Sequence, residues 1–121
     1  MPVPVELTFR GMAQSEALTS HVQAHADQLE HLFDRIVSCH VTVEPAQYRQ
    51  HHEDRYHVSV TLGVPGREIL VKHRPSGEEG PETAYDAVDR AFEEATRELE
   101  AWLRHERAKH HEEPAVRPGA Q

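Results

Sequence analysis

Lysine is almost missing from this chain of 121 residues, in which only Lys72 and Lys109 carry that side chain. Positive charge comes mainly from arginine, and the formal net charge is −8 with the histidines neutral. Non-specific attraction to nucleic acid or to an anionic membrane is driven by positive charge. The overall charge therefore argues against generic binding to either.

Cysteine and long apolar runs are scarce as well. Cys39 is the single cysteine, so the chain has no disulfide framework of its own. Its place on the apolar side of an alternating segment predicts a small buried hydrophobe rather than a nucleophile. No apolar run approaches membrane-spanning length, and no basic stretch followed by an apolar segment opens the sequence. We therefore expect a cytoplasmic protein with no membrane partner.

Motifs for catalysis are also missing. No Gly-rich phosphate loop and no nucleophile–base–acid set stands out, so we expect no enzyme activity, no cofactor and no small-molecule substrate.

Eleven histidines raise the question of metal binding, and His21 and His25 have the i, i+4 spacing found in zinc sites. An H-E-x-x-H motif is absent, however, and one cysteine cannot build a thiolate cage. We therefore expect a solvated histidine-rich surface rather than a specific metal site. Such a surface could still sense pH, because protonated histidines would strengthen attraction to RNA.

Alternating apolar and polar residues predict four β-strands. These strands are expected at residues 3–10, 37–43, 56–62 and 69–73. Between the last two, Val64-Pro65-Gly66-Arg67 suits a type II turn, since proline favours its second position and glycine its third. The last two strands should therefore form an antiparallel hairpin.

Two segments have the apolar periodicity of amphipathic helices. The first follows Ser15, a predicted N-cap, and runs to about Phe33. The second lies between Glu82 and His111, with Thr83 as its cap and an apolar seam from Tyr85 to Trp102. Residues 112–121 contain two prolines and little apolar content, so we expect a disordered tail after a single domain at 1–111.

The element order is therefore β-α-β-β-β-α, which predicts an α+β fold. A strand joined through a helix to the next strand favours parallel pairing, and three further strands in succession favour a meander. We expect a two-layer domain with a four-stranded mixed sheet and two helices on one face. The other face of the sheet would carry polar side chains toward water: His40, Thr42, His57, Ser59 and Thr61.

In this order of elements, SEALTSHVQAHADQLEHLFDRI (Ser15–Ile36) and YDAVD (Tyr85–Asp89) resemble the ribosome hibernation-promoting factor and ribosome-associated inhibitor family. The resemblance covers roughly Val3 to Lys109 and is that of a short form without a C-terminal dimerisation domain. It implies a fold similar to a double-stranded-RNA-binding domain. It also implies a non-catalytic regulator that binds the decoding region of the small ribosomal subunit and its rRNA, and that inactivates or protects ribosomes during stress or stationary phase.

The chain departs from the family in one respect. Family members typically carry many lysines on the exposed faces of both helices, whereas this first helix offers histidine, glutamine and aspartate there. An alternative is therefore a diverged domain of the same fold that acts as a protein-interaction or self-associating module without rRNA binding. The sequence leaves the oligomeric state open.

The candidate rRNA contacts on the second helix are basic residues opposite its apolar seam. Arg90, Arg97 and Arg104 are seven residues apart and form one stripe, which Arg107 and Lys109 extend. Arginine forks at such positions would engage phosphate oxygens.

An ordinary solvent face is the alternative for this stripe. Asp86, Glu93 and Glu100 each stand four residues before one of its arginines, in the orientation that stabilises a helix. Acidic residues thin out toward the end of the helix, so its tip is the less compensated part.

The loop at residues 46–53 supplies two further candidates. Tyr48 could stack on an unpaired base, with Arg49 on a neighbouring phosphate. A polar loop without a ligand is the alternative.

Overall fold

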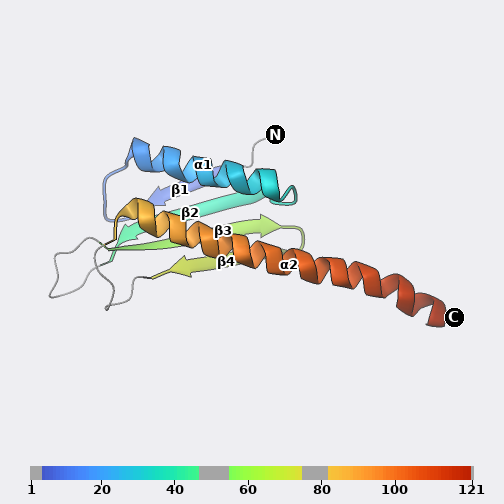
Figure 1. Ribbon diagram of the computed structural model, residues 1–121. Helices are drawn as coiled ribbons and strands as arrows, with labels where there is room; N and C mark the ends of the chain where they lie inside the picture. The colour runs from blue at the N-terminus through green and yellow to red at the C-terminus, as the bar shows by residue number, and fades with distance from the viewer. Residues whose placement is uncertain (1–3, 47–54, 75–81, 121) are drawn as a thin grey trace.

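The computed structural model describes residues 4–46, 55–74 and 82–120, and from residue 109 onward only the backbone. Its elements follow the predicted β-α-β-β-β-α order (Figure 1). They are β1 (Val5–Phe9), α1 (Glu16–Leu32), β2 (Ser38–Pro45), β3 (Tyr56–Val64), β4 (Arg67–His73) and α2 (Ala84–Ala120). Within the described residues, no helix is both long and apolar enough to cross a bilayer.

The four strands form one mixed sheet in the order β1-β2-β3-β4. β1 runs parallel to β2, with Val5 opposite Cys39, and the β2–β3 and β3–β4 pairs are antiparallel. Gly66 has φ of 86° in the turn between β3 and β4, the left-handed region that the third position of a type II turn requires. The predicted crossover, meander and hairpin are confirmed.

Both helices cover the same face of the sheet, α1 beside β1 and α2 across β3 and β4 (Figure 1). One alternating set of strand side chains is therefore buried, including Val41, Val43 and Val60 at 0% exposure. The opposite set is polar and partly open to water, as predicted. This arrangement is the expected two-layer α+β domain.

The seam of α2 differs from its prediction at the first turn. Tyr85 is 40% exposed, and its ring stands edge-on to His21 of α1, with centroids 5.1 Å apart. Burial begins instead at Ala87 and Val88, one turn into the helix. Tyr85 therefore packs against the neighbouring helix rather than the sheet.

Both predicted caps are confirmed. The Ser15 hydroxyl accepts a hydrogen bond from the Leu18 backbone N–H at 3.1 Å, and Thr83 accepts one from Asp86 at 3.0 Å. The backbone of α2 runs helically to Ala120, beyond the predicted domain end at residue 111. The predicted disordered tail at 112–121 falls where no side chain is described, and it stays a prediction.

Truncation of the buried seam should be costly. Leu99→Ala removes a side chain with 0% exposure, and we expect it to lower the free energy of unfolding by about 2–5 kcal/mol. Leu70→Ala is the matched control, because Leu70 is 57% exposed on β4 and should change stability by less than about 0.5 kcal/mol. Urea unfolding of both variants measures the difference. Equal losses would contradict this placement of the core.

Cys39 should be chemically silent in the folded protein. Its side chain is 3% exposed, and burial raises the pKa of the thiol to about 11. The thiolate is the reactive form, so at pH 8 iodoacetamide should leave the native protein unmodified and label it fully in urea. Mass spectrometry after timed quenching measures this, and rapid labelling without denaturant would refute it.

Candidate functional site

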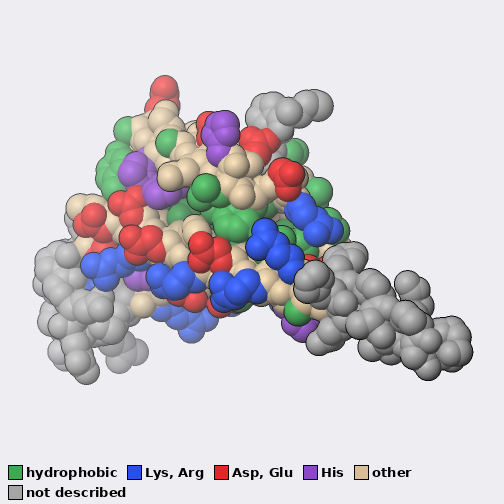
Figure 2. Space-filling model, turned by 45° about the vertical axis from the view of Figure 1, so that its right-hand side comes forward, with side chains coloured by type: hydrophobic (Ala, Val, Ile, Leu, Met, Phe, Trp, Pro, Cys, Tyr) green, Lys and Arg blue, Asp and Glu red, His purple; other side chains and the backbone are tan. Residues whose placement is uncertain are grey.

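The predicted arginine stripe exists on the exposed side of α2. The side chains of Arg90 and Arg97 are 54% and 64% exposed, and Arg104 and Arg107 are also exposed. Figure 2 shows a row of basic side chains (blue) with acidic side chains (red) directly beside them on this face of the molecule. What the stripe can bind therefore depends on which of its cations already have a carboxylate partner.

Arg90 forms an ion pair inside the fold. Its Nε lies 3.3 Å from Oε2 of Glu82, whose side chain is only 7% exposed, and the other oxygen of Glu82 lies 2.9 Å from Nε2 of His73. Helical spacing predicted Asp86, one turn before Arg90, as its partner; the pair with Glu82 joins Arg90 to a residue that precedes the helix. Glu82 therefore links Arg90 of α2 to His73 at the end of β4.

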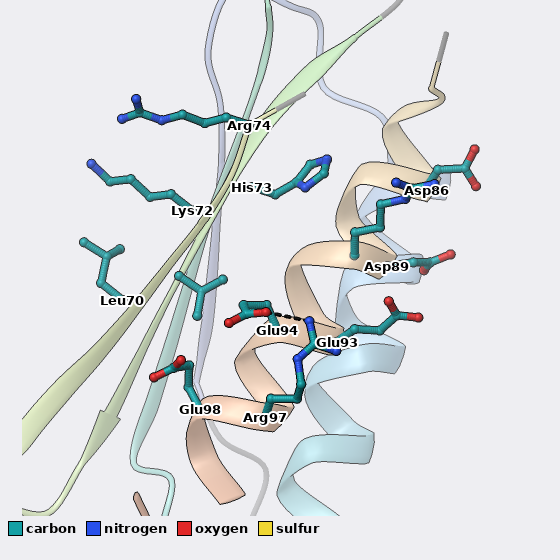
Figure 3. Close-up of a pocket in the computed structure, with 12 residues that line it drawn as sticks. Leu70, Lys72, His73, Arg74, Asp86, Asp89, Glu93, Glu94, Arg97 and Glu98 are labelled. Carbon is teal, nitrogen blue, oxygen red and sulfur yellow. Dashed lines mark hydrogen bonds and ion pairs between the residues drawn. The ribbon is translucent and has the colours of Figure 1, made fainter. Parts of the chain in front are cut away.

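Arg97 pairs along its own helix. Its Nη2 lies 2.5 Å from Oε1 of Glu94, three residues earlier, rather than contacting the predicted Glu93 (Figure 3). The hydrogen bond to Glu94, with the charge of that carboxylate, raises the pKa of Arg97. Its positive charge is therefore largely offset where it stands.

The tip of the stripe is different. Arg104 and Arg107 are exposed, and neither forms an ion pair with any residue whose side chain is described. The predicted pair of Arg104 with Glu100 does not form. Among the stripe positions whose side chains are described, Arg104 and Arg107 are therefore the ones with uncompensated charge.

A third arginine, missed by the sequence reasoning, lies near this tip. The guanidinium carbon of Arg35, just beyond α1, stands 5.3 Å from the centre of the Trp102 ring, within the range of a cation–π contact. Arg35 and Arg107 line the same hollow, of about 280 Å³, between the end of α1 and α2. Arg35 lies at the end of the Ser15–Ile36 motif, but the periodicity of α2 alone cannot show which residue of another element approaches that helix.

A hollow of about 900 Å³ lies between β4 and α2 (Figure 3). Four cations line it, but so do five carboxylates: Lys72, Arg74, Arg90 and Arg97 against Asp86, Asp89, Glu93, Glu94 and Glu98. This balance gives no net attraction for a phosphate group. The hollow is not a phosphate cleft, although half of the predicted arginine stripe borders it.

The open face of the sheet carries a second group of cations. Arg10, Lys72 and Arg74 line a hollow of about 210 Å³ in which Glu44 is the only carboxylate among the described residues. This hollow lies on the face opposite both helices. The sequence predicted a polar sheet face, but not that cations at the end of β4 and just after β1 flank it.

Three of the predicted rRNA contacts involve side chains that the structure does not describe. Tyr48 and Arg49 fall in the segment 47–54, and the side chain of Lys109 is beyond the last described one. Their proposed contacts with rRNA stay predictions.

Only one group of described side chains has the geometry of a cation site, and it joins the two helices. Nε2 of His21 and of His25 lie 2.7 and 2.6 Å from the same oxygen, Oδ1 of Asp89. Partial burial raises the pKa of Asp89, but the hydrogen bonds from His25 and His21 and their charge outweigh it, so the pKa is held below its usual value. Asp89 is therefore a carboxylate at neutral pH, facing two imidazole nitrogens.

Two solved structures share this fold. One is described as a ribosomal subunit interface protein from Coxiella burnetii, with a TM-score of 0.65 and 16% identity over 84% of this chain and 98% of that chain. The other is the Thermus thermophilus Protein Y N-terminal domain, with a TM-score of 0.59 and 16% identity over 84% and 99%. At this identity the likeness concerns the fold alone.

Sequence comparison identifies the family. A comparison with curated protein sequences found no match. The family model described as "Sigma 54 modulation protein / S30EA ribosomal protein", however, matches residues 5–107, which is most of the chain. The chain therefore belongs to the sigma 54 modulation protein / S30EA ribosomal protein family, the ribosome hibernation family that its two helix motifs predicted.

Proposed function

We propose that this protein is a non-catalytic, cytoplasmic regulator that binds the small ribosomal subunit at its decoding region. Occupancy of that region excludes tRNA or mRNA, and the bound ribosome is inactive or protected during stress or stationary phase. Membership of a ribosome-associated family supports the ribosome as partner. The family is not a class of enzymes, which agrees with a mechanism based on occupancy.

The observation that carries the proposal is the uncompensated charge at the tip of the α2 stripe. Arg104 and Arg107 are exposed and form no ion pair among the described side chains. Arg35 and Arg107 line one hollow, in which Asp34 is the carboxylate. Guanidinium groups form paired hydrogen bonds with phosphate oxygens, and an arginine that already holds a carboxylate must first give it up. The tip is therefore the part of the stripe best prepared to contact rRNA.

The first half of the stripe contributes less. Arg97 would have to exchange Glu94 for a phosphate, and Arg90 would leave the nearly buried Glu82 without one of its two partners. The loss of a partner by a buried carboxylate is costly. We therefore rank Arg104 and Arg107 above Arg97, and Arg97 above Arg90, as rRNA contacts.

Removing the tip charges should weaken ribosome binding. Co-sedimentation of Arg104→Gln/Arg107→Gln with small subunits, across a series of salt concentrations, should show reduced binding at every concentration. Each lost phosphate contact also lowers the steepness of the salt dependence by about one unit. Lys72→Gln/Arg74→Gln is the matched control, because it removes the same charge from the open sheet face.

Two outcomes would contradict this prediction. If the wild-type protein does not travel with small subunits even at low salt, the proposed partner is wrong. If both double variants lose binding equally, overall charge matters and the tip of α2 does not. Circular dichroism of each variant excludes unfolding as the cause.

The competing function is a protein-interaction or self-associating module that kept the fold and lost rRNA binding. The net charge of −8 and the acidic excess in the hollow between β4 and α2 favour it. Affinity capture from cells separates the two functions. A capture dominated by one non-ribosomal protein or by a second copy of this chain, without rRNA, would support the module.

A further inference from the structure

We propose that His21 and His25 of α1 and Asp89 of α2 form a binding site for a divalent transition-metal ion of the zinc type, which would tie the two helices together. The proposal concerns the isolated protein and does not depend on ribosome binding. It goes against the expectation from sequence that the histidines form only a solvated surface.

The three donor atoms already converge on one point. They come from two elements, and all lie within 4.8 Å of one another. Ligand atoms around a tetrahedral zinc ion lie about 3.3 Å apart, given metal–ligand distances near 2.0–2.1 Å. The present contacts of 2.6 and 2.7 Å are hydrogen bonds in which each imidazole Nε2–H donates to Oδ1 of Asp89. They would lengthen by less than an ångström when an ion replaces these two protons, which are released to solvent. The two imidazole nitrogens, at most 4.8 Å apart, would at the same time approach each other by up to about 1.5 Å, so all three side chains adjust when an ion binds.

Aromatic neighbours hold both imidazoles in position. The ring of His25 is stacked on the buried Phe92, with centroids 4.8 Å apart and planes 10° from parallel. The ring of His21 stands edge-on to both Tyr85 and His25, at 5.1 Å from each. Because packing fixes the rings, little side-chain freedom would be lost when an ion binds.

The donor set favours a particular class of ion. Two imidazole nitrogens and one carboxylate oxygen suit zinc, cobalt, nickel or copper, whereas magnesium and calcium prefer oxygen ligands alone. The side chains of His21, His25 and Asp89 are 32%, 26% and 42% exposed. The ion would therefore have three protein ligands and a side open to water, an arrangement that zinc accepts.

The surrounding charge also favours a cation. Glu93, one turn after Asp89, lines a hollow together with His25, and Asp86 lies one turn before Asp89. These carboxylates lower the electrostatic cost of bringing a divalent ion to the surface between the helices. The alternative is a hydrogen-bonded clamp between α1 and α2 that binds no ion.

Zinc titration of the full chain distinguishes a metal-binding site from a hydrogen-bonded clamp that binds no ion. The adjacent histidine pairs elsewhere in the sequence could also take up zinc, so the parent for the experiment carries His51→Gln, His52→Gln, His110→Gln and His111→Gln. Calorimetry with zinc chloride at pH 7.5 should show one saturable equivalent in this parent, and magnesium chloride should not compete with it. Asp89→Asn and His25→Gln, each in the same parent, should weaken zinc binding by at least about tenfold.

His40→Gln is the matched control, because His40 lies on the open sheet face and contacts none of the three ligands. It should retain the affinity of the parent. Cobalt gives an independent readout, since a four- or five-coordinate site produces strong visible absorption that the Asp89→Asn variant should lack.

Thermal unfolding guards against a variant that simply fails to fold. Zinc should raise the unfolding midpoint of the parent and of His40→Gln, because it binds the native state. At the same zinc concentration it should raise the midpoint of Asp89→Asn by clearly less. The absence of saturable zinc binding in the parent, or the same affinity in Asp89→Asn, would overturn the proposal and leave the hydrogen-bonded clamp.

Discussion

The close contact of α2 with the sheet is the constraint on which the rest of this structure depends. Ala87, Ala91 and Ala95 are 0% exposed, and side chains this small let the helix backbone approach β3 and β4 closely. Of the larger residues, Phe92 packs against His25 of α1, and Leu99 belongs to the same buried cluster. Dispersion and the removal of apolar surface from water act together along this seam. The seam thereby fixes which side of α2 faces outward.

That fixed orientation decides what the outer side of α2 can do. The start of α2 lies beside the end of β4, where the nearly buried Glu82 forms ion pairs with both His73 and Arg90. The next turn faces α1 and brings Asp89 to two histidines. Among the arginines of α2 whose side chains are described, only Arg104 and Arg107 form no ion pair. The arginines are evenly spaced along α2, but Arg90 and Arg97 are held in ion pairs and Arg104 is not.

The ion pairs of Arg90 and Arg97 also differ in burial, because the carboxylate partner of Arg90 is nearly buried and that of Arg97 is not. The oxygens of Glu82 are removed from water, so its links to Arg90 and His73 compensate a cost that an exposed glutamate would not have. Arg97 and Glu94, in contrast, pair in solvent, where such a contact stabilises little. A phosphate could compete with Glu94 for Arg97 far more easily than with Glu82 for Arg90. Arginines at equivalent spacing along α2 therefore differ in how readily they can bind a phosphate.

The sequence by itself determined the order of elements, the crossover and meander, both helix caps, the turn at Gly66 and most of the buried residues. These follow from local periodicity and from the backbone preferences of proline, glycine and capping residues, all of which act within a few positions of the chain. The family followed from the same local motifs.

Tertiary structure alone decided which charges meet. Helical spacing predicted Glu93 and Glu100 as partners of Arg97 and Arg104, but Arg97 pairs with Glu94, and Arg104 has no ion pair among the described side chains. Spacing along the helix also could not indicate that Arg90 pairs with Glu82, which precedes α2. Tertiary structure likewise placed Asp89 between His21 and His25, across more than sixty residues of sequence. Long side chains reach any neighbour that packing brings within a few ångströms, and the packing of α1 against α2 depends on every element between them.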